Sequence, residues 1–532
     1  STSDRCVDQI FKIPGNEPVV FRFPCCDSLN TPSPRAFAEI INSVTPEGNF
    51  LQASSSICAP LTADDPDLPR KLVQNTDGTP RFAPYFPFEL FVNKVENYPY
   101  PFVVGKLCWE FPLTTPSDWQ AQKRQKPNNP KTVEDLKAAV DATVIKRGMA
   151  NIVFHPHGWI RSDQMLAVID HAIDRWGKKV RFLNFSECVA RLTENLLAGQ
   201  PLRAKDGTDN GIRLMDLDDD GYLDVVIGNA TLQQTRLWQP DRSAWVESSF
   251  PVLLIDSPTA SDTSGDAVPL PCDAGVRFGI LTNDGAASFL VRNEKQAGVW
   301  HFRNGQWQHD RAMLAGLVLD GEPVMTARKG VDQGVRLRDL DGDGIGEVIV
   351  SNPRQNAVFA WNTATKQWVS LPFGLPENAL LVDEKGRDAG LRLVDVNEDG
   401  DADVLFSDDY AFGLYLFDSM QTGWSKKVLS GDRSVEKTIP QITRAGQNNG
   451  AWFAERHLWI QNEDTTRLPG GVDRRSFAEL LGDRPAAPKS PDASLRSIEV
   501  PEGFEVELVA AEPLLCDPVA FDWGPDGALY VI

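Results

Sequence analysis

Three stretches of the sequence place acidic or amide side chains at alternate positions of a short loop with a glycine at its turn. The first stretch reads Asp-x-Asp-x-Asp-Gly-x-x-Asp over residues 216–224, and related stretches cover residues 339–347 and 395–403. Such side chains converge when the backbone curls tightly, and oxygen ligands without Cys or His suit a hard cation, calcium best. The predicted calcium ligands are Asp216, Asp218, Asp220 and Asp224; Asp339, Asp341, Asp343 and Glu347; and Asp395, Asn397, Asp399 and Asp403.

The three loops belong to a longer repeat with a period of about sixty residues. Each unit opens with Asp-x-Gly or Asn-x-Gly, and in the first four units an Arg follows the glycine by two positions. A pair of aromatic residues seven positions apart comes later in each of these units. This period, with about four short strands per unit, is typical of the blades of a β-propeller. The aromatic residues are expected to pack between neighbouring blades. The opening glycines are Gly211, Gly275, Gly334, Gly390 and Gly450.

Two of the five units keep the frame of the repeat without the ligands. Ile280 and Thr282 occupy the first two acidic positions in the second unit, and Glu455 and His457 occupy them in the fifth. We expect no cation in either unit. The repeat resembles the FG-GAP/VCBS repeats of integrin-type propellers over residues 203–465. That resemblance implies an all-β propeller with calcium loops.

Length, net charge and the distribution of apolar residues limit the classes of function that are possible. A chain of 532 residues predicts three or four domains. Its formal charge of −21 argues against a nucleic-acid partner, because a phosphate backbone would be repelled. No apolar run approaches the ~18 residues of a membrane span. Calcium loops of modest charge need the calcium concentration found outside the cytosol, so we expect an exported protein, extracellular or periplasmic. Because the chain starts with Ser, the absence of a signal peptide does not argue against export.

Residues 1–200 differ from the repeat because strand-like and helical stretches alternate along them. Such alternation predicts a parallel sheet or a β/α barrel. The predicted strands cover residues 19–24, 102–107, 150–155 and 180–183, and the predicted helices cover residues 33–41, 132–146, 163–176 and 186–197.

Arg22 and His155 are the candidate catalytic residues, because each follows a predicted strand, where parallel α/β folds gather functional groups. Arg22-Phe23-Pro24 and Val153-Phe154-His155-Pro156 resemble the third and fifth motifs of the polysaccharide deacetylase (NodB-type) family. The resemblance implies a distorted β/α barrel, an Arg that orients a catalytic Asp, a His that acts as general acid, and a zinc ion that activates water.

The resemblance covers only part of that family's pattern. Its Thr-Phe-Asp-Asp motif and its His-x-x-x-His zinc pair are absent, so we expect the C-terminal half of such a barrel. His155 could instead make a purely structural hydrogen bond, and Arg22 a structural ion pair. Glu110 could be a second catalytic carboxylate or an ordinary acid at a strand end, and we favour the latter.

The C-terminal stretch introduces a further region. Residues 466–493 form a predicted linker with a short helix at 476–481. Residues 494–532, with Val500-Pro501-Glu502-Gly503-Phe504 and Asp526-Gly527-Ala528-Leu529-Tyr530, resemble the first strands of a soluble glucose dehydrogenase-type propeller. That family binds pyrroloquinoline quinone.

The sequence therefore predicts a multidomain protein, in which a partial deacetylase-like α/β barrel precedes an all-β propeller with calcium loops. Three functions remain open. The first is a metal-dependent hydrolase acting on a polysaccharide or glycan. The second is a non-catalytic scaffold that binds carbohydrate or protein, and the third is an accessory arm of a large quinone-dependent sugar dehydrogenase.

Overall fold

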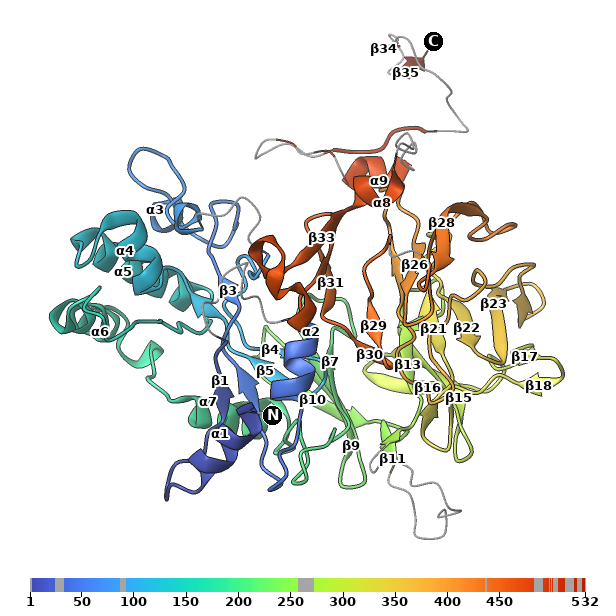
Figure 1. Ribbon diagram of the computed structural model, residues 1–532, viewed down its shortest axis with the longest axis horizontal. Helices are drawn as coiled ribbons and strands as arrows, with labels where there is room; N and C mark the ends of the chain where they lie inside the picture. Colours follow the sequence, from blue (N-terminus) through green and yellow to red (C-terminus); the bar gives the residue numbers. More distant parts are fainter. Residues whose placement is uncertain are drawn as a thin grey trace.

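The computed structural model shows an α/β region and a series of β-sheets that follow one another along the chain (Figure 1). In Figure 1 the α/β region runs from blue to blue-green, and the sheets run from green through yellow to orange-red. The residues described are 2–23, 33–86, 92–256, 272–435, 438–482, 491–496, 498, 500, 506–511, 521–523 and 529–531. Most of the stretch that resembles a dehydrogenase propeller therefore lies outside the described residues.

The α/β region contains a small sheet of order β1-β2-β5-β4. The pairs β1–β2 and β2–β5 are parallel, and β4 runs antiparallel to β5. A second parallel pair, β3–β6, continues the strands β2 and β5 along the chain. The parallel pairing expected from the alternating pattern is confirmed, although no closed barrel forms among the described residues. The strands are β1 (Val20–Phe21), β2 (Ala53–Ser54), β3 (Cys58–Ala59), β4 (Phe102–Val104), β5 (Cys108–Glu110) and β6 (Leu113–Thr114).

The predicted helices of this region are all present, and their ends follow from local sequence. Asn129 caps the helix over 130–145 by accepting a hydrogen bond from the N–H of Lys131, and Pro130 occupies the first turn, where its missing N–H is no loss. The helices are α1 (Thr2–Phe11), α2 (Pro34–Ala36) continued by η1 (Phe37–Ile41), α3 (Arg70–Val73), η2 (Ala83–Tyr85), α4 (Asp118–Gln125), α5 (Pro130–Ile145), α6 (Ser162–Trp176), η3 (Gly177–Lys179) and α7 (Phe185–Arg191) continued by η4 (Leu192–Leu196).

Two predicted strands of the α/β region do not form. Residues 150–155 and 180–183 have no strand pairing, and Phe154 and Phe182 are 58% and 57% exposed. Both segments have the apolar composition that predicts a buried strand. Residues 150–155 do lie beside β6, since the carbonyl of Asn151 accepts the N–H of Thr114 (2.9 Å), but the hydrogen bonds there do not form a strand ladder. The predicted burial is confirmed for Val153, which packs with Cys58 and Leu113, and is wrong for Phe154 and Phe182.

The repeat region forms four antiparallel four-stranded sheets and one three-stranded sheet, each strand pairing with the next along the chain. This arrangement confirms the prediction of about four short strands per repeat unit. The sheets are β7 (Ile212–Met215), β8 (Asp224–Gly228), β9 (Gln233–Gln239), β10 (Ala244–Ser249); β13 (Arg277–Ile280), β14 (Ala287–Arg292), β15 (Ala297–Arg303), β16 (Gln306–Asp310); β21 (Val335–Arg338), β22 (Glu347–Asn352), β23 (Gln355–Asn362), β24 (Gln367–Ser370); β25 (Leu391–Val394), β26 (Asp403–Ser407), β27 (Ala411–Leu416), β28 (Lys426–Asp432); and β31 (Ala451–Ala454), β32 (His457–Ile460), β33 (Asp473–Ser476).

Two-stranded pairs lie between the sheets, η5 and η6 lie between β32 and β33, and two helices and a last strand pair follow the fifth sheet. The predicted helix at 476–481 is confirmed as α8. These elements are β11 (Ile255–Asp256), β12 (Cys272–Asp273), β17 (Val318–Leu319), β18 (Glu322–Pro323), β19 (Ala327–Arg328), β20 (Val331–Asp332), β29 (Thr443–Arg444), β30 (Gln447–Asn448), η5 (Glu463–Arg467), η6 (Pro469–Gly471), α8 (Phe477–Leu481), α9 (Pro491–Arg496), β34 (Phe521–Trp523) and β35 (Leu529–Val531).

Aromatic residues fill the space between successive sheets, as expected. Trp368 of the third unit is buried in a core shared with the second unit and donates its Nε1–H to the carbonyl of Met313 (2.8 Å). Trp307 of the second unit donates to Thr235 of the first (2.9 Å). In the second unit Trp307 lies opposite Phe302 and not opposite the aromatic residue seven positions earlier.

Candidate metal centres and candidate active-site residues

The first acidic loop joins β7 to β8 and brings three carboxylates together. One oxygen from each of Asp216, Asp218 and Asp224 lies within 4.8 Å of the others. Asp224 is the first residue of β8 and is completely buried. Its oxygens accept hydrogen bonds from the N–H groups of Leu217 (3.0 Å) and Trp238 (2.8 Å). The buried acid therefore anchors the loop to the sheet, and the three carboxylates converge on one point.

The loop of the third unit, between β21 and β22, repeats this geometry. Asp339, Asp341 and Glu347 bring three carboxylate oxygens within 4.8 Å of one another. Glu347 is the first residue of β22 and is buried, and it accepts the N–H of Leu340 (2.8 Å). Asp339 accepts the N–H of Gly344 (2.9 Å), which closes the turn. Three of the four residues predicted in this loop therefore approach one another, and their role as cation ligands stays a prediction.

The third acid of these two loops makes turn contacts and stands outside the two groups of converging carboxylates. Asp220 accepts the N–H of Tyr222 (2.9 Å), and Asp343 accepts the N–H of Ile345 (2.7 Å). Their assignment as cation ligands stays a prediction.

The loop of the fourth unit, between β25 and β26, has the same backbone but a different donor set. Asp403 anchors it by accepting the N–H groups of Val396 (3.0 Å) and Phe417 (2.9 Å). The side-chain amide of Asn397 donates to Asp399 (2.7 Å), so one predicted ligand is engaged by another. Asp395 accepts the N–H of Gly400. With an amide in place of one acid, this loop carries less negative charge at its alternate positions than the other two.

Negative charge in the three loops is poorly compensated. Burial raises the pKa of Asp224 to about 6 and the pKa values of Glu347 and Asp403 to about 7, against the opposing effect of the backbone N–H groups. Burial and the neighbouring acids also raise the pKa values of Asp218 and Asp341. A cation would remove this repulsion. Because every converging atom is oxygen, the donor set fits calcium and does not favour a softer metal.

The loop of the second unit has a guanidinium beside its acid. Arg303 of β15 donates to Asp284 through Nε (2.7 Å) and to Thr282 through Nη2 (3.2 Å). Thr282 in turn donates to Asp284 (2.6 Å). The ion pair lowers the pKa of Asp284, opposite to the shift in the acidic loops. The guanidinium therefore places a positive charge beside the acid of this loop.

In the fifth unit, the loop between β31 and β32 lacks the acidic pattern and contacts the fourth unit. Arg456 forms an ion pair with Glu398 from the loop of the fourth unit. His457 contacts the backbone carbonyl of Glu455 through its ring. Among the described residues, no group of three potential ligands lies in this hairpin.

Arg22 follows β1 and binds neighbouring strand ends. Its Nε donates to the carbonyl of Ser55 (2.9 Å) and its Nη2 donates to the hydroxyl of Ser55 (2.7 Å). Nη2 also lies 3.4 Å from the side-chain oxygen of Asn151. The structure thus places Arg22 at the carboxyl ends of β1 and β2, as the sequence predicted.

His155 is held by a carboxylate that the sequence analysis missed. Asp118 lies at the start of α4, is almost completely buried, and approaches Nδ1 of His155 at 2.7 Å. Its other oxygen accepts the backbone N–H of His155 (2.6 Å). This pair directs Nε2 of a half-exposed ring away from the carboxylate, which is the arrangement of an oriented acid–base histidine. Trp159 contacts the same ring, with centroids 5.3 Å apart.

Glu110 ends β5 and is completely buried. Its Oε1 accepts the N–H groups of Ser56 (2.6 Å) and Ile57 (2.9 Å), while Oε2 has no hydrogen-bond partner among the described residues. Burial raises its pKa. The carboxyl joins the strand ends that carry Arg22, but neither Arg22 nor Glu110 contacts His155 in the hydrogen bonds of the structure.

The sequence analysis did not identify two of the side chains described above, Asp118 and Arg303. Asp118 follows Ser117 at the start of a helix, and Ser117 and Gln120 form a capping box. That motif predicts a helix start and gives no hint of a histidine partner. Arg303 stands 19 residues after Asp284, across a hairpin, so only the strand register reveals the pair.

The comparisons with known proteins support the repeat. Residues 339–406 match a family model described as an FG-GAP-like repeat, so this chain contains such a repeat. Residues 490–532 match a domain of unknown function (DUF7133). None of the curated proteins compared with the chain matches it. Both family matches lie outside residues 1–200, so the deacetylase resemblance stays a prediction, as does the quinone.

Among solved structures, the chain is similar to an Agrocybe aegerita lectin described as recognising non-reducing terminal N-acetylglucosamine. The likeness covers 41% of this chain and 50% of the lectin chain, with 17% sequence identity and a TM-score of 0.27. The chain therefore spans about half the length of that lectin, and at this TM-score the likeness carries no argument about fold or function. Within the described residues, no helix is both long and apolar enough to cross a membrane.

Proposed function

We propose that this chain is a binding scaffold whose repeat region is held in shape by calcium. The observation that carries the proposal is the contrast between units. The first and third units each converge three carboxylates, whereas the second unit carries Arg303 against Asp284 in the same part of the sheet. The FG-GAP-like match supports the repeat. The ligand that such a scaffold would present or hold is a glycan or a protein.

Calcium suits these loops better than magnesium or zinc. Magnesium requires a tight octahedral shell and gives up its waters reluctantly, whereas calcium accepts a flexible set of carboxylates and backbone carbonyls. Zinc favours sulfur and nitrogen ligands, and among the described residues the groups of potential ligands contain neither Cys nor His. Loops of this kind in extracellular modules bind calcium with dissociation constants of about 10⁻⁴–10⁻³ M. That range supports an exported location.

Titration calorimetry on the full chain after treatment with EDTA tests the proposal. We expect binding in the three acidic loops, and a higher melting temperature in calcium than in EDTA. Asp341→Asn should remove one site, because it leaves two converging carboxylates in the third unit. Asp284→Asn is the matched control in the second unit and should leave the stoichiometry unchanged. Absence of binding at several millimolar calcium, or a stoichiometry that Asp341→Asn does not alter, would contradict the proposal.

A hydrolase acting on an acetylated polysaccharide is the second candidate, and the pair of His155 and Asp118 favours it. The imidazole is oriented by a buried carboxylate and is half exposed, as a general acid requires. The zinc that the deacetylase resemblance implies would need ligands beyond those grouped among the described residues. We therefore expect no release of acetate from acetylated chito-oligosaccharides by this chain alone. Release that a zinc chelator abolishes would reverse this ranking of the two functions.

A further inference from the structure

The series of five sheets has two ends that do not meet through strand pairing. The first four sheets have four strands each, and the fifth has three. Among the described residues, no strand of the fifth sheet pairs with a strand of the first. Successive sheets in such a series bury their faces against one another, so the first and fifth sheets each keep one face that no repeat unit covers. Those two faces need a partner.

The α/β region covers the free face of the first sheet. Ala53 of β2 and Trp109 of β5 are buried in one apolar core with Ile212, Val225 and Ile227 of β7 and β8. All five side chains are at most 2% exposed. The core also includes partly buried side chains from both regions. Burial this complete within one shared core is typical of elements that fold as one unit.

The same region also reaches the fifth unit. Helix α2 lies against β30 and β31, as Figure 1 shows. Arg35 of α2 donates to the side chain of Asn449 (3.0 Å) and forms an ion pair with Glu463 (3.1 Å). Arg35 is held on its own helix by Glu39 (2.8 Å), which keeps the guanidinium directed between the two partners. One side of the α/β sheet therefore adjoins the first unit, and α2 adjoins the fifth.

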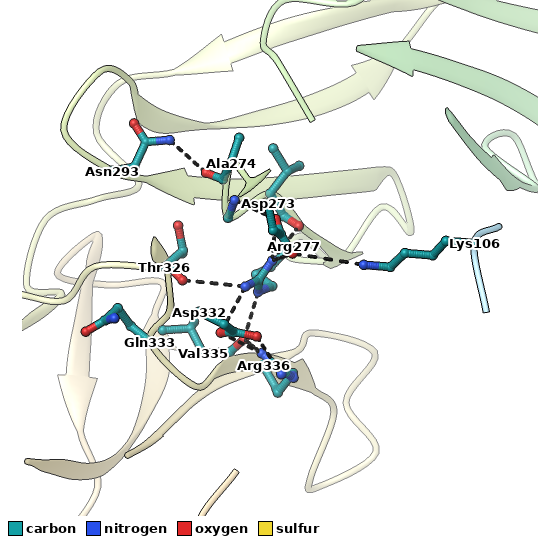
Figure 2. A network of polar contacts seen from close by, with 12 residues as sticks. Lys106, Asp273, Ala274, Arg277, Asn293, Thr326, Asp332, Gln333, Val335 and Arg336 are labelled. Atoms are coloured by element: carbon teal, nitrogen blue, oxygen red, sulfur yellow. Dashed lines mark hydrogen bonds and ion pairs between the residues drawn. The ribbon is translucent and has the colours of Figure 1, made fainter. Parts of the chain in front are cut away.

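The tip of the β4–β5 hairpin extends to the second unit. Lys106 lies at this tip, and its Nζ is 4.0 Å from Asp273, as Figure 2 shows. Asp273 also pairs with Arg277 (3.3 Å), and Arg277 bridges to Asp332 of the third unit (3.0 Å). The hairpin therefore meets a network that joins successive units. A body that contacts the fifth, first and second units lies across the opening of the series.

Arg203, at the start of the repeat region, contacts the α/β region through hydrogen bonds to backbone carbonyls and not through an ion pair with a carboxylate. Its guanidinium donates to the carbonyls of Ile41, Asn42, Ser43 and Leu51 at 2.7 to 3.1 Å. Three of these carbonyls follow one another at the end of η1, where helical carbonyls lack partners. Burial lowers the pKa of Arg203 to about 10. The contact places a buried cation on the boundary itself.

We propose that the α/β region closes the ring of repeat units, occupying the position of a further blade between the fifth unit and the first. The partner that fits the two end faces is therefore this chain's own β1-β2-β5-β4 sheet with α2. Closure makes the two regions one cooperative unit. It also removes the end faces from contact with an external glycan or protein, which must bind elsewhere on the scaffold. The inference does not depend on calcium.

The test uses the full chain with a site-specific protease sequence inserted after Gly199, an exposed glycine between η4 and the first unit. After native cleavage in millimolar calcium, size-exclusion chromatography with light scattering reports whether the two pieces stay together. We expect one complex of unchanged mass and a single unfolding transition. Separation into two folded pieces, or a repeat fragment that keeps the melting temperature of the intact chain, would overturn the proposal.

Point variants of the cleaved chain locate the interface. Arg35→Ala removes both contacts to the fifth unit, and we expect the dissociation constant of the two pieces to rise about tenfold or more. Arg444→Ala is the matched control, since Arg444 pairs with Asp464 within the same unit and lies outside the proposed interface. It should change the constant less than about twofold. Equal effects of the two variants would overturn the assignment of Arg35 to the closing contact.

Discussion

Replacing Glu347 by Gln should stabilise the calcium-free protein and at the same time remove a calcium site. Glu347 is 3% exposed and accepts the N–H of Leu340 (2.8 Å). Glutamine keeps an oxygen acceptor for that N–H and loses the charge. The two effects have opposite signs, so they distinguish a cation-binding acid from an ordinary structural one.

The magnitude follows from the pKa of Glu347, which burial raises from 4.5 to about 7. Each pKa unit corresponds to about 1.4 kcal/mol, so the buried carboxylate lowers the free energy of unfolding by about 3 kcal/mol once it is ionised. The pKa is raised in the folded state, so this stability is fully present below pH 4.5 and is lost as the pH rises through 7. In EDTA, Glu347→Gln should match the native chain near pH 4.5 and exceed it by up to about 3 kcal/mol at pH 8.

Urea unfolding in EDTA and in excess calcium, at pH 5 and pH 8, measures both effects. Calcium adds about 2.7 kcal/mol per site at a hundredfold excess over its dissociation constant. That gain should be larger at pH 8 than at pH 5, and Glu347→Gln should lose one site's share of it. Glu294→Gln is the control, since Glu294 is an exposed acid that accepts the N–H of Lys329. A Glu347→Gln variant that is less stable than the native chain in EDTA at pH 8 would refute the reasoning.

Two further predictions concern the α/β region. Arg203→Ala should lower the free energy of unfolding by on the order of 3 kcal/mol, because four carbonyls lose a charged donor, and chemical denaturation measures the loss. An unchanged midpoint would contradict the role of Arg203 at the boundary. His155→Ala should change stability by less than about 1 kcal/mol, because the ring is half exposed. In any larger protein where the α/β region is an active hydrolase, the same variant should lower the rate by about 10²–10⁴. Full activity, or failure to fold, would leave His155 with a structural role.

Local spacing predicted three of the four side chains that approach one another in the loops of the first and third units. Asp216, Asp218 and Asp224 approach one another because alternate positions of a tight turn and the first residue of the next strand are neighbours in any such loop. The start of α5 is likewise set locally, since Asn129 and Pro130 act within one turn. Interactions over a few residues are specified by the chain itself.

The failures share a physical cause. Residues 150–155 and 180–183 have the apolar composition of buried strands, but strand formation depends on a partner strand whose position the local sequence does not state. Asp118 lies 37 residues from His155, and Arg35 lies 414 residues from Asn449. No spacing rule connects such pairs.

The sequence by itself determined the repeat, its strand-rich units and the two loops in which three carboxylates converge, because each depends on contacts between residues close together in the chain. The tertiary structure decided which loop acid pairs with an arginine, which carboxylate orients His155, and where the α/β region packs against the first and fifth units. These features depend on how sheets and helices far apart in the chain are packed, and side-chain packing over long range is set only when the whole core forms.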